Sequence, residues 1–190
     1  HDDVILDSPE GNIRISIQVG KDGLAVYSVL YRNLPVIENS SLGIIREDGD
    51  FYSGMKLDSV SGVTTVQESY SLLYGKTKEA RYEAKRRVFH FSNAAGGQMD
   101  VIFQVSDEGV AFCYSFHGAP DDVKKIISEK TGFNFAAGTT GWIQPRAASK
   151  SGWNQSNPSY EEHYLEEILL DSVTPGKNGW VFPALFHTEN

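Results

Sequence analysis

The sequence is poor in cysteine. Cys113 is the only one among 190 residues, which excludes an internal disulfide framework and zinc sites built from cysteine thiolates. No apolar run approaches the roughly 18 residues of a membrane-spanning helix, and no signal peptide precedes the first strand-like segment. Basic residues are few as well, with 17 Lys and Arg against 25 Asp and Glu and a formal net charge of −8. We therefore expect neither a membrane span nor nucleic acid as a partner, because nucleic-acid binding normally needs a clustered basic face.

Motifs for nucleophilic catalysis are also missing from the sequence. The chain has no Gly-x-Ser-x-Gly elbow and no glycine-rich phosphate loop. The histidines show no metal-ligand spacing, and we expect most of them to be surface or structural residues: His1, His90, His117, His163 and His187. Cys113 lies between Phe112 and Tyr114 in an alternating strand, so we expect a buried and unreactive thiol.

The dominant period of the sequence is two, which is typical of β-strands with one buried face. Residues 13–19 alternate isoleucine or valine with polar side chains. A Lys-Asp-Gly turn at residues 21–23 follows and predicts a hairpin with residues 24–31. The same alternation predicts strands at residues 101–105 and 110–116.

Further strands are expected at residues 34–38, 42–46, 81–91 and 180–186. The strand at residues 81–91 favours an edge or a solvent-facing surface, because one face carries Arg81, Glu83, Lys85 and Arg87. Turn signals recur about every 8–12 residues, which is the spacing of a sandwich or barrel. The sequence therefore predicts a single, mainly all-β domain over residues 1–190 with few short helices. The last strand ends without a closing turn, so we expect the chain to continue beyond Asn190.

Residues 136–158 are rich in Gly, Ser, Thr and Asn and predict a loop that carries Trp142 and Trp153. A loop folded over the edge of the core is the favoured interpretation. Solvated tryptophans would instead form, together with Tyr160, a stacking platform for sugars. An independent carbohydrate-binding module is thus one alternative function, and an interaction domain without a ligand is another.

The densest acidic group of the sequence comprises Glu161, Glu162, Glu166 and Glu167. Converging carboxylates can bind calcium, which takes about 6–8 oxygen ligands, and two carboxylates can act as acid and base on a glycosidic bond. A solvated acidic face is nevertheless favoured by the residues alone, and more strongly for the second group, Glu47, Asp48 and Asp50. A capping box at residues 159–162 allows a short helix through Ile168, and an extended segment is nearly as compatible.

Six short blocks of the sequence can be compared with a known family, because they stand in the same order as there. They lie at residues 8–12, 23–31, 41–43, 107–114, 129–133 and 160–164. Each is weak singly, but together they resemble the opening of glycoside hydrolase family 97 along nearly the whole chain. The block at residues 160–164, Tyr-Glu-Glu-His-Tyr, looks like the Tyr-Glu-x-x-Tyr motif of that family. Cys113 departs from the family pattern, which usually has arginine at this position.

The resemblance implies a multidomain bacterial enzyme that cleaves α-glycosidic bonds, as an α-glucosidase or an α-galactosidase. It implies an N-terminal β-super-sandwich similar to the galactose mutarotase fold, a central (β/α)8 barrel with the catalytic carboxylates, and a small C-terminal β domain. This chain would be most of the N-terminal domain and inactive alone. Its partners would be its own barrel and, through the barrel, an oligosaccharide substrate. Export to the periplasm is implied in the same way.

The resemblance also implies a calcium ion near the cleft, held mainly by barrel glutamates and by one glutamate of this domain. That glutamate corresponds to Glu161, with Glu162 as the second choice. The isolated domain would bind calcium weakly or not at all, because it supplies too few oxygen ligands. The sugar, the inverting or retaining course of the reaction and the oligomeric state depend on residues outside this chain.

Overall fold

The computed structural model describes residues 3–118, 123–146, 163–172, 174 and 179–188, and these residues form strands and no helix. Two compact units, His1–Asn134 and Phe135–Asn190, divide the chain, and each is described by itself. The strands of the first unit are β1 (Val4–Asp7), β2 (Ile13–Val19), β3 (Ala25–Tyr31), β4 (Leu34–Ser41), β5 (Ile44–Arg46), β6 (Gly49–Phe51), β7 (Lys56–Val60), β8 (Thr64–Ser71), β9 (Glu79–Ser92), β10 (Gln98–Ser106), β11 (Val110–Phe116) and β12 (Ile126–Glu129). Those of the second unit are β13 (Thr140–Pro145), β14 (Leu165–Leu169) and β15 (Trp180–His187).

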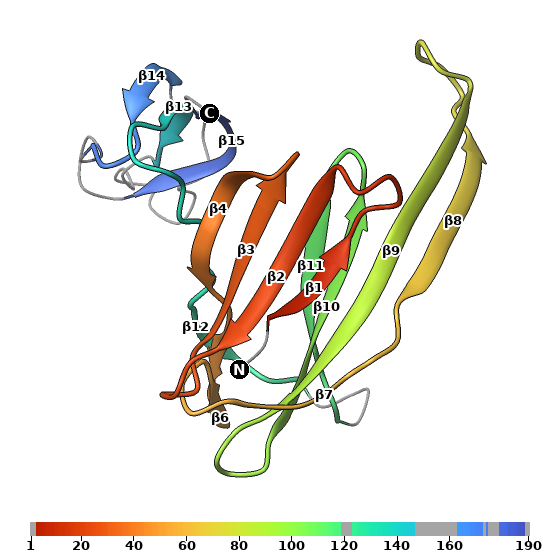
Figure 1. Ribbon diagram of the computed structural model, residues 1–190. Helices are drawn as coiled ribbons and strands as arrows, with labels where there is room; N and C mark the ends of the chain where they lie inside the picture. The colour runs from red at the N-terminus through yellow and green to blue at the C-terminus, as the bar shows by residue number, and fades with distance from the viewer. Residues whose placement is uncertain (1–2, 119–122, 147–162, 173, 175–178, 189–190) are drawn as a thin grey trace. The chain divides into compact units, whose positions relative to one another are not determined.

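The first unit is a sandwich of antiparallel sheets (Figure 1). One sheet has the strand order β1-β2-β3-β4, and the other has the order β11-β10-β9-β7 with β8 added alongside β9. A small sheet of order β12-β5-β6 lies in the same unit. The predictions of an all-β fold, of the hairpin between β2 and β3 and of strands at β10 and β11 are therefore confirmed, and the last two also pair with each other.

The core lies between the two larger sheets and follows from the alternation of the sequence. Isoleucines of β2 face hydrophobic side chains of β10, while the residues between them remain at least partly accessible. Phe103 on β10 is fully buried, and its ring lies 5.9 Å from that of Tyr27 on β3 and 5.1 Å from that of Phe112 on β11. Burial of each such side chain stabilises the fold by roughly 1.5–3 kcal/mol. Apolar contacts of this kind join the two sheets.

Strand β9 differs from its prediction as an edge strand. It pairs with β10 on one side and with β7 and β8 on the other. Two of the charged residues expected to face solvent reach across the sandwich instead. Lys85 Nζ donates to Ser8 O at 3.1 Å, and Arg87 Nη1 donates to Ile5 O at 2.9 Å. Their long side chains place the charged groups at the border of the core, where carbonyl oxygens in and next to β1 accept their hydrogen bonds.

The turn between β2 and β3 depends on a glycine. Gly23 has φ +75°, and a Cβ there would lie 2.5–2.6 Å from backbone atoms of Gly54 and Met55. The same backbones are hydrogen bonded, because Met55 N donates to Gly23 O at 2.9 Å. The turn therefore packs directly against the segment that leads into β7.

We expect Gly23→Ala to lower the free energy of unfolding well beyond the matched variant Gly11→Ala. Gly11 has φ +78° with open space around it, so alanine there costs only the left-handed conformation, about 1 kcal/mol. Alanine at Gly23 adds a backbone clash, worth about 1–3 kcal/mol more. Urea titration followed by circular dichroism measures both. Equal destabilisation by the two variants would show that the backbone at Gly54 and Met55 moves away from the added Cβ without a further loss of stability.

Candidate functional site

Of the site residues predicted from sequence, Trp142 lies within the described part of the chain, whereas Trp153, Tyr160, Glu161 and Glu162 lie outside it. Trp142 is half-buried on β13, where it pairs with Leu185 of β15. The loop predicted over residues 136–158 is thus wrong at Thr140–Pro145, which form the central strand of a three-stranded sheet. The strand forms because alternate residues there, including Ile143, are buried.

The described end of the Tyr-Glu motif is held on this small sheet. The hydroxyl of Tyr164, the last residue of the motif, donates to Pro183 O of β15 at 2.9 Å. Strand β14 begins at the next residue and pairs with β13. A helix continuing through Ile168 is therefore wrong, and the extended alternative is confirmed for residues 165–169.

Strand β14 contains a bulge at two residues of the first acidic group, Glu166 and Glu167. Gly141 pairs with Ile168 and Ile143 pairs with Leu165, so Glu166 and Glu167 together oppose the single residue Trp142. Glu167 has φ +52°, and both glutamates are exposed. One extra residue in a strand produces such a bulge and redirects side chains. The expectation of a solvated face is confirmed for these two glutamates.

The second acidic group, in the first unit, is occupied by bonds within the protein. Glu47 Oε1 accepts from Lys125 N at 2.9 Å, and Asp48 is paired with Arg46. Hydrogen bonding by Ser53 lowers the pKa of Asp50, and the Arg46 guanidinium lowers that of Asp48. All three carboxylates are exposed, so the expectation of a solvated acidic face is confirmed for this group as well.

The structure also joins two histidines that the sequence left apart. Asp100 on β10 accepts on Oδ1 from His90 Nδ1 at 2.7 Å and on Oδ2 from His117 Nε2 at 3.0 Å. With Asp58 and Ser59 the three line a hollow of about 310 Å³. The pairing of His90 with Asp100 across the β9–β10 ladder was the signal that sequence reasoning missed. No group of three or more His, Cys, Asp or Glu side chains in the described part of the chain could hold a metal ion.

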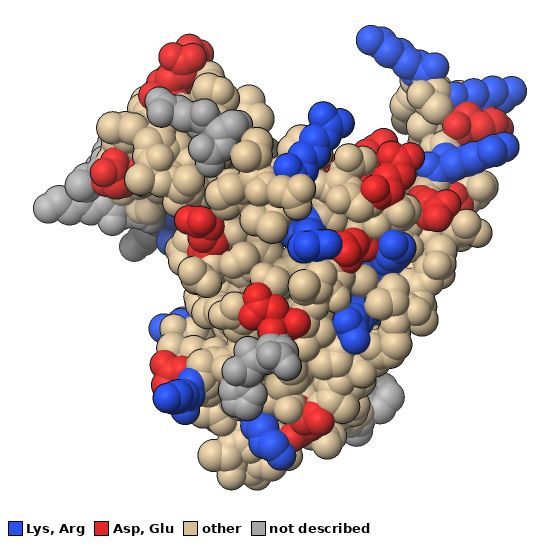
Figure 2. Space-filling view, in the orientation of Figure 1, with Lys and Arg blue, Asp and Glu red and all other residues tan. Residues whose placement is uncertain are grey.

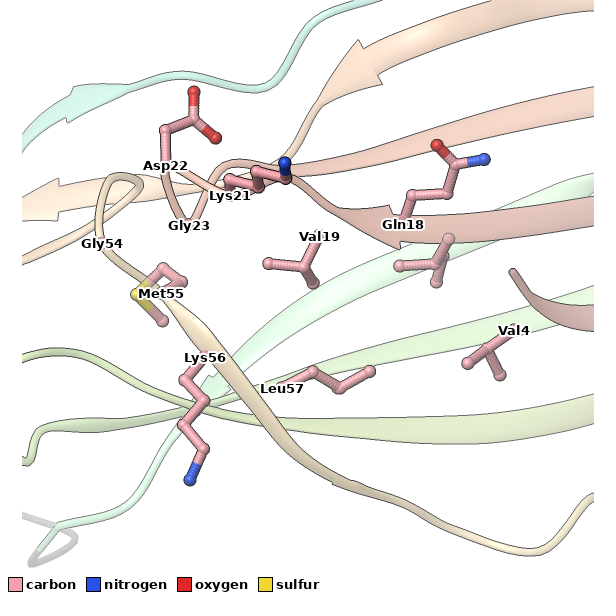
Figure 3. A pocket seen from close by; sticks show the side chains of 12 residues that line it. Val4, Gln18, Val19, Lys21, Asp22, Gly23, Gly54, Met55, Lys56 and Leu57 are labelled. Carbon is pink, nitrogen blue, oxygen red and sulfur yellow. The ribbon is translucent and has the colours of Figure 1, made fainter. Parts of the chain in front are cut away.

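A larger hollow of about 460 Å³ opens at one end of the sandwich (Figure 3). Its lining combines aliphatic side chains of Val4, Val19 and Leu57 with the glycine turn between β2 and β3. The side chain of Lys56 at its border is paired with Asp58, at 3.3 Å. This hollow separates the ends of two sheets, and we assign no chemistry to it.

Cys113 is exposed on β11, and the prediction of a buried thiol is wrong. Its neighbours Phe112 and Tyr114 contact the core, and their rings lie 5.8 Å apart. Successive side chains of a strand point to opposite faces, so the residue between two inward rings points outward. The error lay in expecting both faces of β11 to be covered.

Five of the six blocks that carry the family resemblance lie in the first unit. Ser8 Oγ and Glu10 N both donate to the Asp107 carboxylate, which joins residues 8–12 to residues 107–114. Tyr27 Oη donates to Gly132 O at 3.0 Å, which joins residues 23–31 to residues 129–133. Residues 41–43 are bonded to Lys130 and to Tyr114, so each of these five blocks reaches another through hydrogen bonds. This arrangement stabilises the sandwich rather than assembling reactive groups.

Comparisons with known proteins agree with this architecture. The family model described as Glycosyl-hydrolase 97 N-terminal matches residues 6–190. A probable retaining alpha-galactosidase of Streptomyces bingchenggensis (strain BCW-1) is 30% identical over 155 residues, which are 75% of this chain and 24% of that protein. The crystal structure of a beta-arabinopyranosidase superposes with a TM-score of 0.88 and 31% identity, over 97% of this chain and 30% of that chain.

A variant of a glycoside hydrolase family 97 enzyme from Pseudoalteromonas sp. strain K8 is also similar, with a TM-score of 0.67 and 25% identity. The match covers 75% of this chain and 22% of that one. The present chain therefore spans less than a third of the length of each of these relatives. No helix in the described residues is long and apolar enough to cross a membrane.

We expect the Cys113 thiol to react readily in the native protein, because it is exposed. Labelling with a chromogenic disulfide should modify one thiol per chain without denaturant, at a rate similar to that in urea. The variant Cys113→Ser controls for nonspecific reaction. A native thiol that reacts only after unfolding would restore the buried interpretation.

Proposed function

The chain belongs to the glycosyl hydrolase 97 N-terminal family, and we propose that it is the non-catalytic N-terminal domain of an enzyme that hydrolyses glycosides. The family match over residues 6–190 carries this proposal. The catalytic carboxylates would lie in the remainder of the polypeptide, a barrel against which this domain packs. The domain's own contribution is architectural, with one glutamate donated to the barrel. Export to the periplasm belongs to the proposal and rests on the resemblance alone.

We propose a galacto-configured sugar as the substrate of the whole enzyme. Two relatives with at least 30% identity support this, one an alpha-galactosidase and the other a beta-arabinopyranosidase. A β-L-arabinopyranoside has the ring configuration of an α-D-galactopyranoside and lacks only the hydroxymethyl group at C5. Both names therefore describe an axial glycosidic bond on the same ring. This shared stereochemistry narrows the expected substrates from α-glucosides and α-galactosides to α-galactosides and their pentose analogues.

We propose Glu161 as the one calcium ligand from this domain, with Glu162 as the second choice. The motif supports the proposal, and so does the bond of Tyr164 to Pro183, which fixes the described end of the motif on the β13–β15 sheet. Carboxylate oxygen is the ligand type that calcium prefers. The ion, when bound, would supply Lewis-acid polarisation of a substrate oxygen. Glu161 would help to hold it from outside the barrel.

We expect the full-length protein to hydrolyse a nitrophenyl α-galactoside and a nitrophenyl β-L-arabinopyranoside in preference to an α-glucoside. The isolated 190-residue chain should hydrolyse none of them, because the catalytic carboxylates are proposed to lie elsewhere. Release of nitrophenol measures each reaction. Preference for the glucoside would overturn the proposed sugar, and turnover by the isolated chain that depends on its own glutamates would overturn the non-catalytic role.

We expect Glu161→Ala in the full-length enzyme to raise the calcium concentration needed for half-maximal activity by about tenfold or more, as loss of groups that support a metal site does. The calcium-dependent rise in melting temperature should shift in parallel. Glu162→Ala is the matched control and should change little. A larger effect of Glu162→Ala would move the ligand by one position, and no effect of either would make the motif structural.

A further inference from the structure

Strands β8 and β9 continue as a two-stranded ribbon past the end of their sheet. Strand β10 pairs with β9 from Ser92 to Ala84, whereas β8 pairs with it from Arg86 to Glu79. Residues 79–83 of β9 therefore pair with β8 and not with β10, and Figure 1 shows the ribbon projecting from the sandwich. A two-stranded hairpin on its own is only marginally stable in water.

The loop that joins the two strands is well closed. Leu72 N donates to Lys78 O at 2.8 Å, and Ser71 Oγ donates to the Glu79 carboxylate at 2.8 Å. Gly75, with φ +123°, allows the turn between them. The loop therefore presents its side chains from a defined backbone.

Those side chains are unusually apolar for a projecting loop. Leu73 is 97% exposed, Tyr74 is 88% exposed and Tyr70 is 52% exposed. We call residues 70–78 the hairpin tip. Large hydrophobic residues gathered at one exposed point are typical of an interaction surface, whereas scattered ones need no explanation.

The hairpin tip contains two lysines and no acidic residue, in a chain that is acidic as a whole. Lys76 and Lys78 in the tip are exposed, as are Glu79 and Arg81 next to it. Figure 2 shows blue side chains, with a red one among them, at the end of the ribbon. A symmetric contact between two copies through this tip would bring the same lysines together. Their repulsion disfavours a second copy and favours a partner surface with acidic side chains around an apolar centre.

We propose that the hairpin tip docks on the remainder of its own polypeptide, onto an apolar surface bordered by acidic residues. The inference rests on the proposed function, which makes this chain one domain of a larger enzyme. This chain corresponds to 30% of the chain of the related beta-arabinopyranosidase, so most of such an enzyme lies outside it and could cover the tip. Covalent linkage raises the effective concentration of that partner far above that of a second copy.

Thiol labelling of the full-length enzyme tests the contact. Leu73→Cys is made in a Cys113→Ser background, and Val123→Cys, at a position that is 90% exposed in a different loop, is the matched control. Both positions are so exposed in this domain that neither substitution should affect folding. We expect the thiol at position 73 to react about ten times more slowly in the native enzyme than in urea, because docking blocks reagent access. The control thiol should react at similar rates in both.

Native labelling at position 73 as fast as in urea would overturn the docking. Protection that disappears on dilution, together with dissociation seen by light scattering, would assign the tip to a second copy and also overturn the proposal. Galactoside hydrolysis is measured on the same samples. An active enzyme with an unprotected tip contradicts only the docking, and a protected tip in a protein that cleaves no glycoside contradicts only the proposed function.

Discussion

The hydrogen bonds of one buried and one partly buried tyrosine connect the sheets of the first unit to residues 129–133. Tyr27, on β3, donates its hydroxyl to Gly132 O, while the hydroxyl of Tyr114, on β11, accepts from Gly43 N at 2.9 Å and lies 2.7 Å from Thr131 Oγ1. Burial raises the pKa of Tyr27 to about 12 and that of Tyr114 above its usual value. Each ring fills the core while its hydroxyl is satisfied by backbone or side-chain oxygen and nitrogen. The position of β12 against β5 follows from these contacts.

Strand β9 lies in three different environments along its length. Its last residues, Phe89 and Phe91, are fully buried and fix the strand in the core. Next to them, Lys85 and Arg87 close the border towards β1 by donating to carbonyl oxygens. Residues 79–83, which precede Ala84, do not pair with β10, and their side chains are exposed or only partly buried. A single strand thus passes from core to border to projecting surface, so its hydrophobic pattern changes along its length.

This change of environment marks the limit of what the sequence could predict. The alternation in residues 13–19 and 101–105 located β2 and β10 because each has one buried and one accessible face. The prediction for residues 81–91 was an edge or a solvent-facing surface, and the exposed Arg81 and Glu83 agree with a solvent-facing surface. It is wrong for Lys85 and Arg87, which are partly buried and donate to backbone carbonyl oxygens. Cys113 was misjudged for a related reason, since the period of two was applied to its neighbours and not to Cys113 itself.

The second unit shows why the candidate site was harder to predict than the sandwich. Strand β13 was not predicted because the Gly, Ser and Thr residues around it are typical of a loop. Its pairing also depends on bulges opposite Trp142 and Ile143, which the periodicity of the sequence does not predict. A calcium ion needs about 6–8 oxygen ligands, so the single ligand proposed for this domain does not require a cluster of acidic residues in this chain. Its sequence therefore reads as an ordinary antiparallel fold with an acidic surface. In the proposed site the only described anchor of the motif is Tyr164, its last residue, and the remaining ligands would come from another part of the polypeptide.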